Sequence, residues 1–207
     1  MEEVPDVYAR PYNPDHPVIC PDESPKQSIS ESRTPFTDSK GVTYTDYEYK
    51  REGAVDLYMV TEPSGGRREV PVKDKHTRLD QADVVAYMAE EMYLSAEKIT
   101  LIRDNLSACK KSALYEIFEP KRARSILDKI EFVNIPKHGS RLNIAECELS
   151  VLTRQALKGR IPGKDESIHK VTDWYETRNS KTSKVDWQFT TENARVKLKR
   201  LYPTIKP

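Results

Sequence analysis

The chain has 207 residues, of which 37% are hydrophobic and 32% are charged, and its formal net charge is +1. This length suits one sizeable domain, and the apolar runs that recur along the chain exclude disorder throughout it. No apolar run approaches the roughly 18 residues of a membrane-spanning helix, and no secretory leader is visible. We therefore expect a soluble, cytoplasmic protein with no membrane partner.

The three cysteines, Cys20, Cys109 and Cys147, lack the C-x-x-C spacing that is typical of zinc sites. Each lies in or beside a predicted core element, and Cys20 is expected to be buried in the core. The pattern predicts neither a zinc site nor a disulfide framework, and it favours a reducing compartment.

The first third of the chain reads mainly as strand and loop. Residues 1–15 are polar, include three prolines and are expected to lead into the domain. Residues 16–20 form a short apolar run that stops at Pro21-Asp22, which predicts a short buried strand. Residues 24–53 show little periodicity and predict loop with short strand pieces. The clear strand signals that follow cover residues 54–60 and 67–72, joined as a hairpin by the turn at 63–66.

The remaining two thirds alternate between helix and strand. In the segment 77–92 apolar residues recur every three or four positions and Thr77 can cap the N-terminus, which predicts a helix. Further strands are predicted over residues 99–102 and 131–135. Further helices are predicted over residues 107–118, from 120 to near 129, from near 142, over 165–177 and over 191–201. This order suits one α/β domain, with a mixed sheet flanked by helices.

Three acidic residues occupy positions that suit metal chemistry. Asp22 and Asp104 each follow a predicted strand, and Glu146 lies in the sequence LNIAE at the start of a predicted helix. Functional groups in open α/β sheets gather beyond the carboxyl ends of strands, and converging carboxylates suit Mg²⁺. Each acid taken alone also suits a structural role: Asp22 and Asp104 as turn residues, and Glu146 with Asn143 as a capping box.

Six segments resemble the catalytic region of bacterial insertion-sequence transposases of the group allied to the mariner elements. They occur in the same order over roughly residues 8 to 203, and they are PVICPDE, DYEYKREG, KITLIRDN, PKHGSRLNIAECELSVL, VDWQFTT and ARVKLKRLYP. The resemblance implies a ribonuclease-H-like α/β fold in a single domain over residues 16–203. Residues 1–15 would be the lead-in and residues 204–207 a tail.

The same resemblance implies a DDE active site. Asp22, Asp104 and Glu146 match the acidic triad, and they would be both the catalytic residues and the ligands of Mg²⁺ or Mn²⁺, as two ions. The implied reaction is hydrolysis at transposon ends, followed by attack of the freed 3′-hydroxyl on target DNA. The implied partners are transposon-end and target DNA and a second copy of the chain, in the bacterial cytoplasm at the nucleoid. Residues expected near the site or in contact with DNA are Asn105, Lys137, His138, Arg141 and Asn143.

The sequence departs from the family pattern at four positions. Cys109 replaces a histidine, Arg141 replaces a tryptophan, and Pro21 and Arg103 replace apolar residues before the first two acids. Arg103 is expected to pair either with Asp104 or with a DNA phosphate.

Helix-turn-helix segments, which family members place before the catalytic domain, are not expected here, because Met1 lies only a few residues before the first predicted strand. We therefore expect the chain alone to bind transposon ends poorly. Two other functions stay open: a catalytically inert remnant that binds DNA or protein, and a hydrolase of another phosphodiester.

Overall fold

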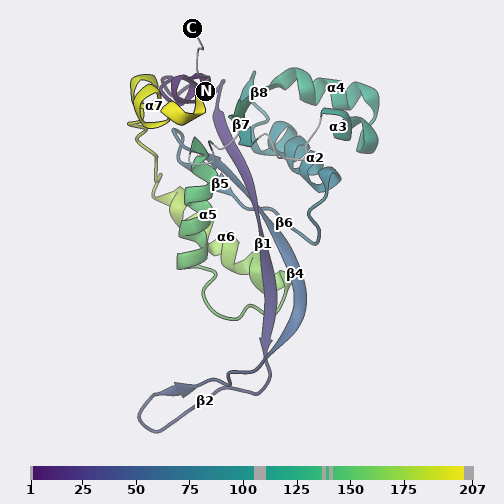
Figure 1. Cartoon of the computed structure of the whole chain (residues 1–207). Helices are drawn as coiled ribbons and strands as arrows, with labels where there is room; N and C mark the ends of the chain where they lie inside the picture. Colours follow the sequence, from purple (N-terminus) through teal and green to yellow (C-terminus); the bar gives the residue numbers. More distant parts are fainter. Residues whose placement is uncertain (1, 105–110, 137–138, 140–141, 203–207) are drawn as a thin grey trace.

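The computed structural model describes residues 2–104, 111–136, 139 and 142–202 (Figure 1). In this part of the chain six strands form one mixed sheet in the order β5-β4-β1-β7-β8, with β6 paired to β4. The pairs β1–β7 and β7–β8 are parallel, whereas β4 runs antiparallel to β1, β5 and β6. The strands are β1 (Val18–Glu31), β2 (Phe36–Thr37), β3 (Thr43–Tyr44), β4 (Tyr49–Glu62), β5 (Arg67–Glu69), β6 (Val72–Lys73), β7 (Ile99–Asp104) and β8 (Ile130–Ile135).

Helices cover both faces of this sheet, and the alternation of side chains along β4 separates two cores. Val55, Leu57 and Met59 belong to one core, which α1, α5 and α6 share. Tyr58 and Val60 belong to the other, which α2, α3 and α4 share. The predicted α/β class, a mixed sheet flanked by helices, is confirmed. The helices are α1 (Glu3–Tyr8), α2 (Arg78–Tyr87), α3 (Lys111–Ile117), α4 (Pro120–Lys129), α5 (Ile144–Gln155), α6 (Lys164–Ser180) and α7 (Thr191–Lys197).

The predicted helix over residues 77–92 is observed as α2 followed by a π-helical turn, Met88–Met92. Its predicted cap is also present, because the Thr77 hydroxyl accepts a hydrogen bond from the backbone N–H of Asp80 and the Asp80 carboxylate accepts one from the backbone N–H of Thr77. The part of the predicted helix at residues 107–110 lies outside the described residues. None of the described helices combines the length and apolar character that crossing a bilayer requires.

The first strand is much longer than the sequence predicts. The prediction of a short strand over residues 16–20, with loop and short strand pieces over 24–53, is wrong in the extent of strand, because β1 and β4 pair from Cys20–Thr61 to Glu31–Tyr49 with one shift of register after Ser28. Figure 1 shows them as a long ribbon that leaves the body of the molecule. Backbone hydrogen bonds hold this outer part, and the β4 residues at 49–54 are exposed. Apolar alternation, the signal used to predict strands, is therefore missing there.

Beyond this ribbon the chain forms a projecting segment, residues 32–48, which we call the arm. Strands β2 and β3 pair within it, and Phe36 stacks on Tyr44 with ring centroids 4.9 Å apart. Arg160, from the connection between α5 and α6, donates hydrogen bonds to the backbone carbonyls of Asp46, Tyr47 and Glu48. The arm is thus fixed at its base to the body of the molecule.

Candidate active site

Asp22 and Asp104 occupy equivalent positions on neighbouring parallel strands. The parallel pairing of β1 with β7 ends at Ile19 and Leu101, and each acid lies three residues beyond its strand's last paired residue. From there β1 continues along β4, whereas β7 continues along β8 until Asp104 lies opposite Ile135. The prediction that Asp22 follows its strand is wrong, because Asp22 lies within β1, whereas Asp104 is the last residue of β7. They lie just past the point where the two strands separate.

Both acids also share one face of the sheet. Cys20 and Ile102 are buried in the core formed with α5. Side chains two residues apart on a strand point the same way, and Asp22 and Asp104 lie two residues after Cys20 and Ile102. The α5 side of the sheet therefore carries both carboxylates.

Glu146 approaches this face from the first turn of α5. The Asn143 side chain caps the helix by accepting a hydrogen bond of 3.1 Å from the backbone N–H of Ala145. Ile144 and Ala145 are buried, which anchors the turn, and Glu146 is exposed beside them. Of the predicted capping box, the described contacts include only the half made by Asn143, so Glu146 is available for another role.

The three carboxylates lie within electrostatic range of one another. The pKa of Asp22 is raised to about 7, chiefly by burial and also by the negative charges of Glu23, Glu146 and Asp104, and a hydrogen bond from the backbone N–H of Glu23 opposes the rise. Burial and the charge of Asp104 also raise the pKa of Glu146. Such shifts are typical of acids gathered in one site.

These acids influence one another electrostatically, but they are not arranged as a ready set of metal ligands. Among the described residues no three His, Cys, Asp or Glu side chains are placed to hold one metal ion. Of the other predicted site residues, Asn143 is 2% exposed and caps α5. The predictions for Asn105, Lys137, His138 and Arg141, and the departure at Cys109, lie outside the described residues. Arg103 donates a hydrogen bond to the Asn134 side chain and lies over the Phe132 ring.

A second acidic group on the other side of β1 was not predicted. The Glu23 carboxylate lies 3.4 Å from Nε2 of His76, whose Nδ1 lies 3.6 Å from the Asp56 carboxylate. Burial raises the pKa of Glu23, and His76 opposes the rise. In the sequence, only the position of Glu23 directly after Asp22 could have indicated this second acidic group. Glu23 also lines a small cavity of about 40 Å³ with Asp22 and the buried Gln81.

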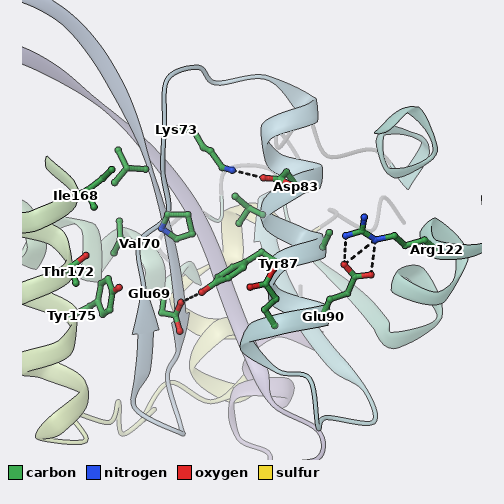
Figure 2. A pocket seen from close by; sticks show the side chains of 15 residues that line it. Glu69, Val70, Lys73, Asp83, Tyr87, Glu90, Arg122, Ile168, Thr172 and Tyr175 are labelled. Carbon is green, nitrogen blue, oxygen red and sulfur yellow. Dashed lines mark hydrogen bonds and ion pairs between the residues drawn. The ribbon is translucent and has the colours of Figure 1, made fainter. Parts of the chain in front are cut away.

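A larger pocket of about 360 Å³ lies away from the three acids, between α2, α4, α6 and the β5–β6 segment. Figure 2 shows that several of its charged side chains pair with one another. Lys73 donates to Asp83 and Arg122 to Glu90, and the Tyr87 hydroxyl donates to Glu69. Four of the charged side chains that line the pocket are thus paired with one another.

Comparison with known protein families decides the assignment. The profile of the family described as DDE superfamily endonuclease matches residues 17–169, well over half of the chain. The chain belongs to the DDE superfamily endonucleases. The matched region contains all three acids of the site, and the predicted family resemblance is confirmed. None of the curated proteins gives a match.

Solved structures support the fold of this DDE endonuclease. A crystal structure of the Mos1 mariner paired-end complex with Mn matches with a TM-score of 0.50 and 13% identity, over 82% of this chain and 51% of that chain. A Mos1 transposase paired-end complex with the left transposon end matches at a TM-score of 0.33 and 13% identity, over 82% of this chain and 56% of that chain. The endonuclease chain thus spans about half the length of these transposase chains. Its fold is like the ribonuclease-H-like catalytic domain of mariner transposase.

Proposed function

We propose that this chain is a transposase catalytic domain, in which Asp22, Asp104 and Glu146 hold divalent metal ions that promote DNA end cleavage and strand transfer. The observation that carries the proposal is that three acids from β1, β7 and α5 lie within electrostatic range of one another, and that Asp22 and Glu146 each have a raised pKa. A cation placed between them would offset both the burial and the mutual repulsion that raise these pKa values.

The donor set fits Mg²⁺ or Mn²⁺, because these ions prefer carboxylate oxygens and retain several waters. Two such ions supply a nucleophile generated from bound water or hydroxyl and stabilise the leaving oxygen. Asp22 and Asp104, on adjacent strands, would share both ions, and Glu146 would complete the second site. Among the described residues no three acids are already placed to hold one ion, so binding would draw these carboxylates closer together.

DNA is the proposed substrate and partner. Support comes from the family, whose members are endonucleases, and from the Mos1 structure of the same fold, which is a paired-end complex with Mn. Self-association of this chain on DNA is part of the same proposal, as is an origin in a bacterial insertion sequence.

The test is Mn²⁺- or Mg²⁺-dependent nicking of DNA by the wild type and by Asp22→Asn, Asp104→Asn and Glu146→Gln. Each substitution keeps the side-chain shape and removes one charged ligand, so we expect nicking to fall by at least about 100-fold. The control is Asp128→Asn, which removes an exposed acid of α4 that pairs only with Arg124 among the described contacts. Nicking by Asp104→Asn at the wild-type rate would contradict the proposal, and preferential cleavage of RNA would favour the hydrolase of another phosphodiester.

One observation favours a second candidate, a catalytically inert transposase remnant that binds DNA or protein. Among the described residues the acids do not form a ready set of three metal ligands. The two candidates differ in metal binding: the catalytic domain binds Mn²⁺ through its acids, and the inert remnant does not.

A further inference from the structure

Tyr8 belongs to a segment that the sequence suggested was only a polar lead-in. Val4, Val7 and Tyr8 lie on one side of α1 and are buried in the core that contains α5, with Tyr8 5% exposed. The Tyr8 ring packs on Trp187 with centroids 4.3 Å apart. The ring is therefore held in place, and its hydroxyl has a fixed position.

The Tyr8 hydroxyl joins two elements of the candidate site. It donates a hydrogen bond of 3.0 Å to the backbone carbonyl of Leu142, and it lies 2.9 Å from Sγ of the fully buried Cys20. Because a hydroxyl has one proton to donate, the thiol of Cys20 is the donor in the second contact. Burial raises the pKa of both groups, so both remain protonated at neutral pH.

Each end of this chain of hydrogen bonds is close in sequence to an acid of the proposed site. Cys20 precedes Asp22 by two residues on β1 and shares its face of the sheet. Leu142 directly precedes Asn143, the cap of α5, whose first turn carries Glu146. The tyrosine hydroxyl thus bridges the strand of one acid and the helix start of another. It is neither a ligand nor in contact with a reacting group.

We propose that Tyr8 is a positioning residue that fixes the first turn of α5 against β1, and with it the separation of Glu146 from Asp22. The inference rests on the proposed metal-dependent function, because that separation matters only if the acids share ions. Without the tie, the mutual repulsion of the acids favours a wider separation, and small displacements of ligands weaken a site strongly.

The test compares Tyr8→Phe with Tyr93→Phe in the full chain. Tyr93 is a matched control, since it is also buried, its hydroxyl donates one side-chain hydrogen bond, to Glu62 at 3.3 Å, and it lies in the other core. Both variants should lower the melting temperature slightly. Only Tyr8→Phe should weaken Mn²⁺ binding, by about tenfold, and only it should speed amide hydrogen exchange at residues 144–146.

Two further variants guard against a general loss of folding. Cys20→Ser keeps a donor to the Tyr8 oxygen and should bind Mn²⁺ as the wild type does, whereas Cys20→Ala removes the donor and should bind more weakly. Wild-type Mn²⁺ affinity and unchanged exchange in Tyr8→Phe would overturn the inference. If the wild type itself binds no Mn²⁺, the proposed function fails, and the exchange data alone decide whether Tyr8 holds α5.

Discussion

At Asp22, the first acid of the proposed site, burial and neighbouring acids oppose the negative charge that binding a metal ion would need. The protein thereby stores a local instability at the site, as active sites often do. The hydrogen bond of 3.0 Å from the backbone N–H of Glu23 to Oδ1 of Asp22 offsets only part of it.

We predict that Asp22→Asn raises the free energy of unfolding in the absence of metal. The pKa of Asp22 is about 7 in the folded chain and about 4 in the unfolded chain, so the folded state holds a proton that the unfolded state loses between these values. Wild-type stability therefore falls as pH rises from about 4 to 7 and stays reduced above 7. The Asn variant should be more stable by about 1–2 kcal/mol at pH 8, after allowance for solvent screening, and equally stable at pH 4.

Urea unfolding at pH 4 and pH 8, with chelator present, measures this difference. Asparagine can keep the hydrogen bond from Glu23, so the charge is the main change. A variant that is less stable than the wild type at pH 8 would contradict the prediction.

We also predict that metal affinity depends on pH near neutrality. An ion must displace the proton from Asp22, whose pKa is about 7. The dissociation constant of Mg²⁺ should therefore rise toward tenfold for each pH unit below about 7 and level off above about 8. Titrations at pH 6, 7 and 8 test this, and equal affinity at all three would count against Asp22 as a ligand.

Sequence reasoning selected the three candidate acids through family resemblance, and it missed the residues that surround them. Asp22, Asp104 and Glu146 each also suited turns or caps, so spacing alone could not select them. Tyr8 was missed although Val4, Val7 and Tyr8 have helical spacing, because the prolines nearby suggested a lead-in. Its partners Cys20 and Leu142 lie 12 and 134 residues away in the sequence. The residues around Tyr8 contain no pattern that predicts such contacts.

Among the elements, α5 and α6 are locked to β5 by a buried charge cluster. Arg68, whose side chain is fully buried, forms two hydrogen bonds to the Glu148 carboxylate, at 2.8 and 3.0 Å. Arg178 of α6 donates to the same carboxylate, and the Asn179 side chain pairs with the backbone of Arg68. Glu148 lies two residues after Glu146, so this cluster fixes the helix that carries the third acid.

Glu148→Ala should therefore lower the free energy of unfolding by about 3–5 kcal/mol, because it leaves a buried arginine without its counter-charge. For a chain of this size the melting temperature should fall by roughly 10 °C. The control is Glu166→Ala, which breaks an exposed pair with Lys170 on α6 and should cost about 0.5 kcal/mol or less. Calorimetric melting of both variants separates the two cases, and similar melting temperatures would refute the role of the cluster.

Elements were predictable where apolar residues recur and not where backbone pairing alone holds the chain. The helix at 77–92 and its Thr77 cap were predicted because periodicity and capping chemistry agree. The outer half of β1 was not predicted as a strand, because residues such as Lys26 and Gln27 are polar and pair with β4 through the backbone. Polar strands outside a core carry no periodic signal.

For the molecule as a whole, the arm is separable from the two cores. Its aromatic side chains are exposed, with Phe36 at 63% and Tyr47 at 87%, and no arm residue belongs to either core in the described chain. Replacing residues 33–47 by Asn-Gly, a pair suited to a tight hairpin, should shift the melting temperature by less than about 4 °C. A cooperative loss of the fold in the shortened chain would show that the arm supports the cores.

We propose that Asp22, Asp104 and Glu146 bind divalent metal together. Calorimetry can measure Mn²⁺ binding by the wild type, by Asp104→Ala and by the control Asp128→Ala. We expect the wild type and the control to bind Mn²⁺. Asp104→Ala should not bind it, because removing Asp104 takes a shared carboxylate from both ions. Equal binding by all three proteins, or none by the wild type, would contradict the proposal.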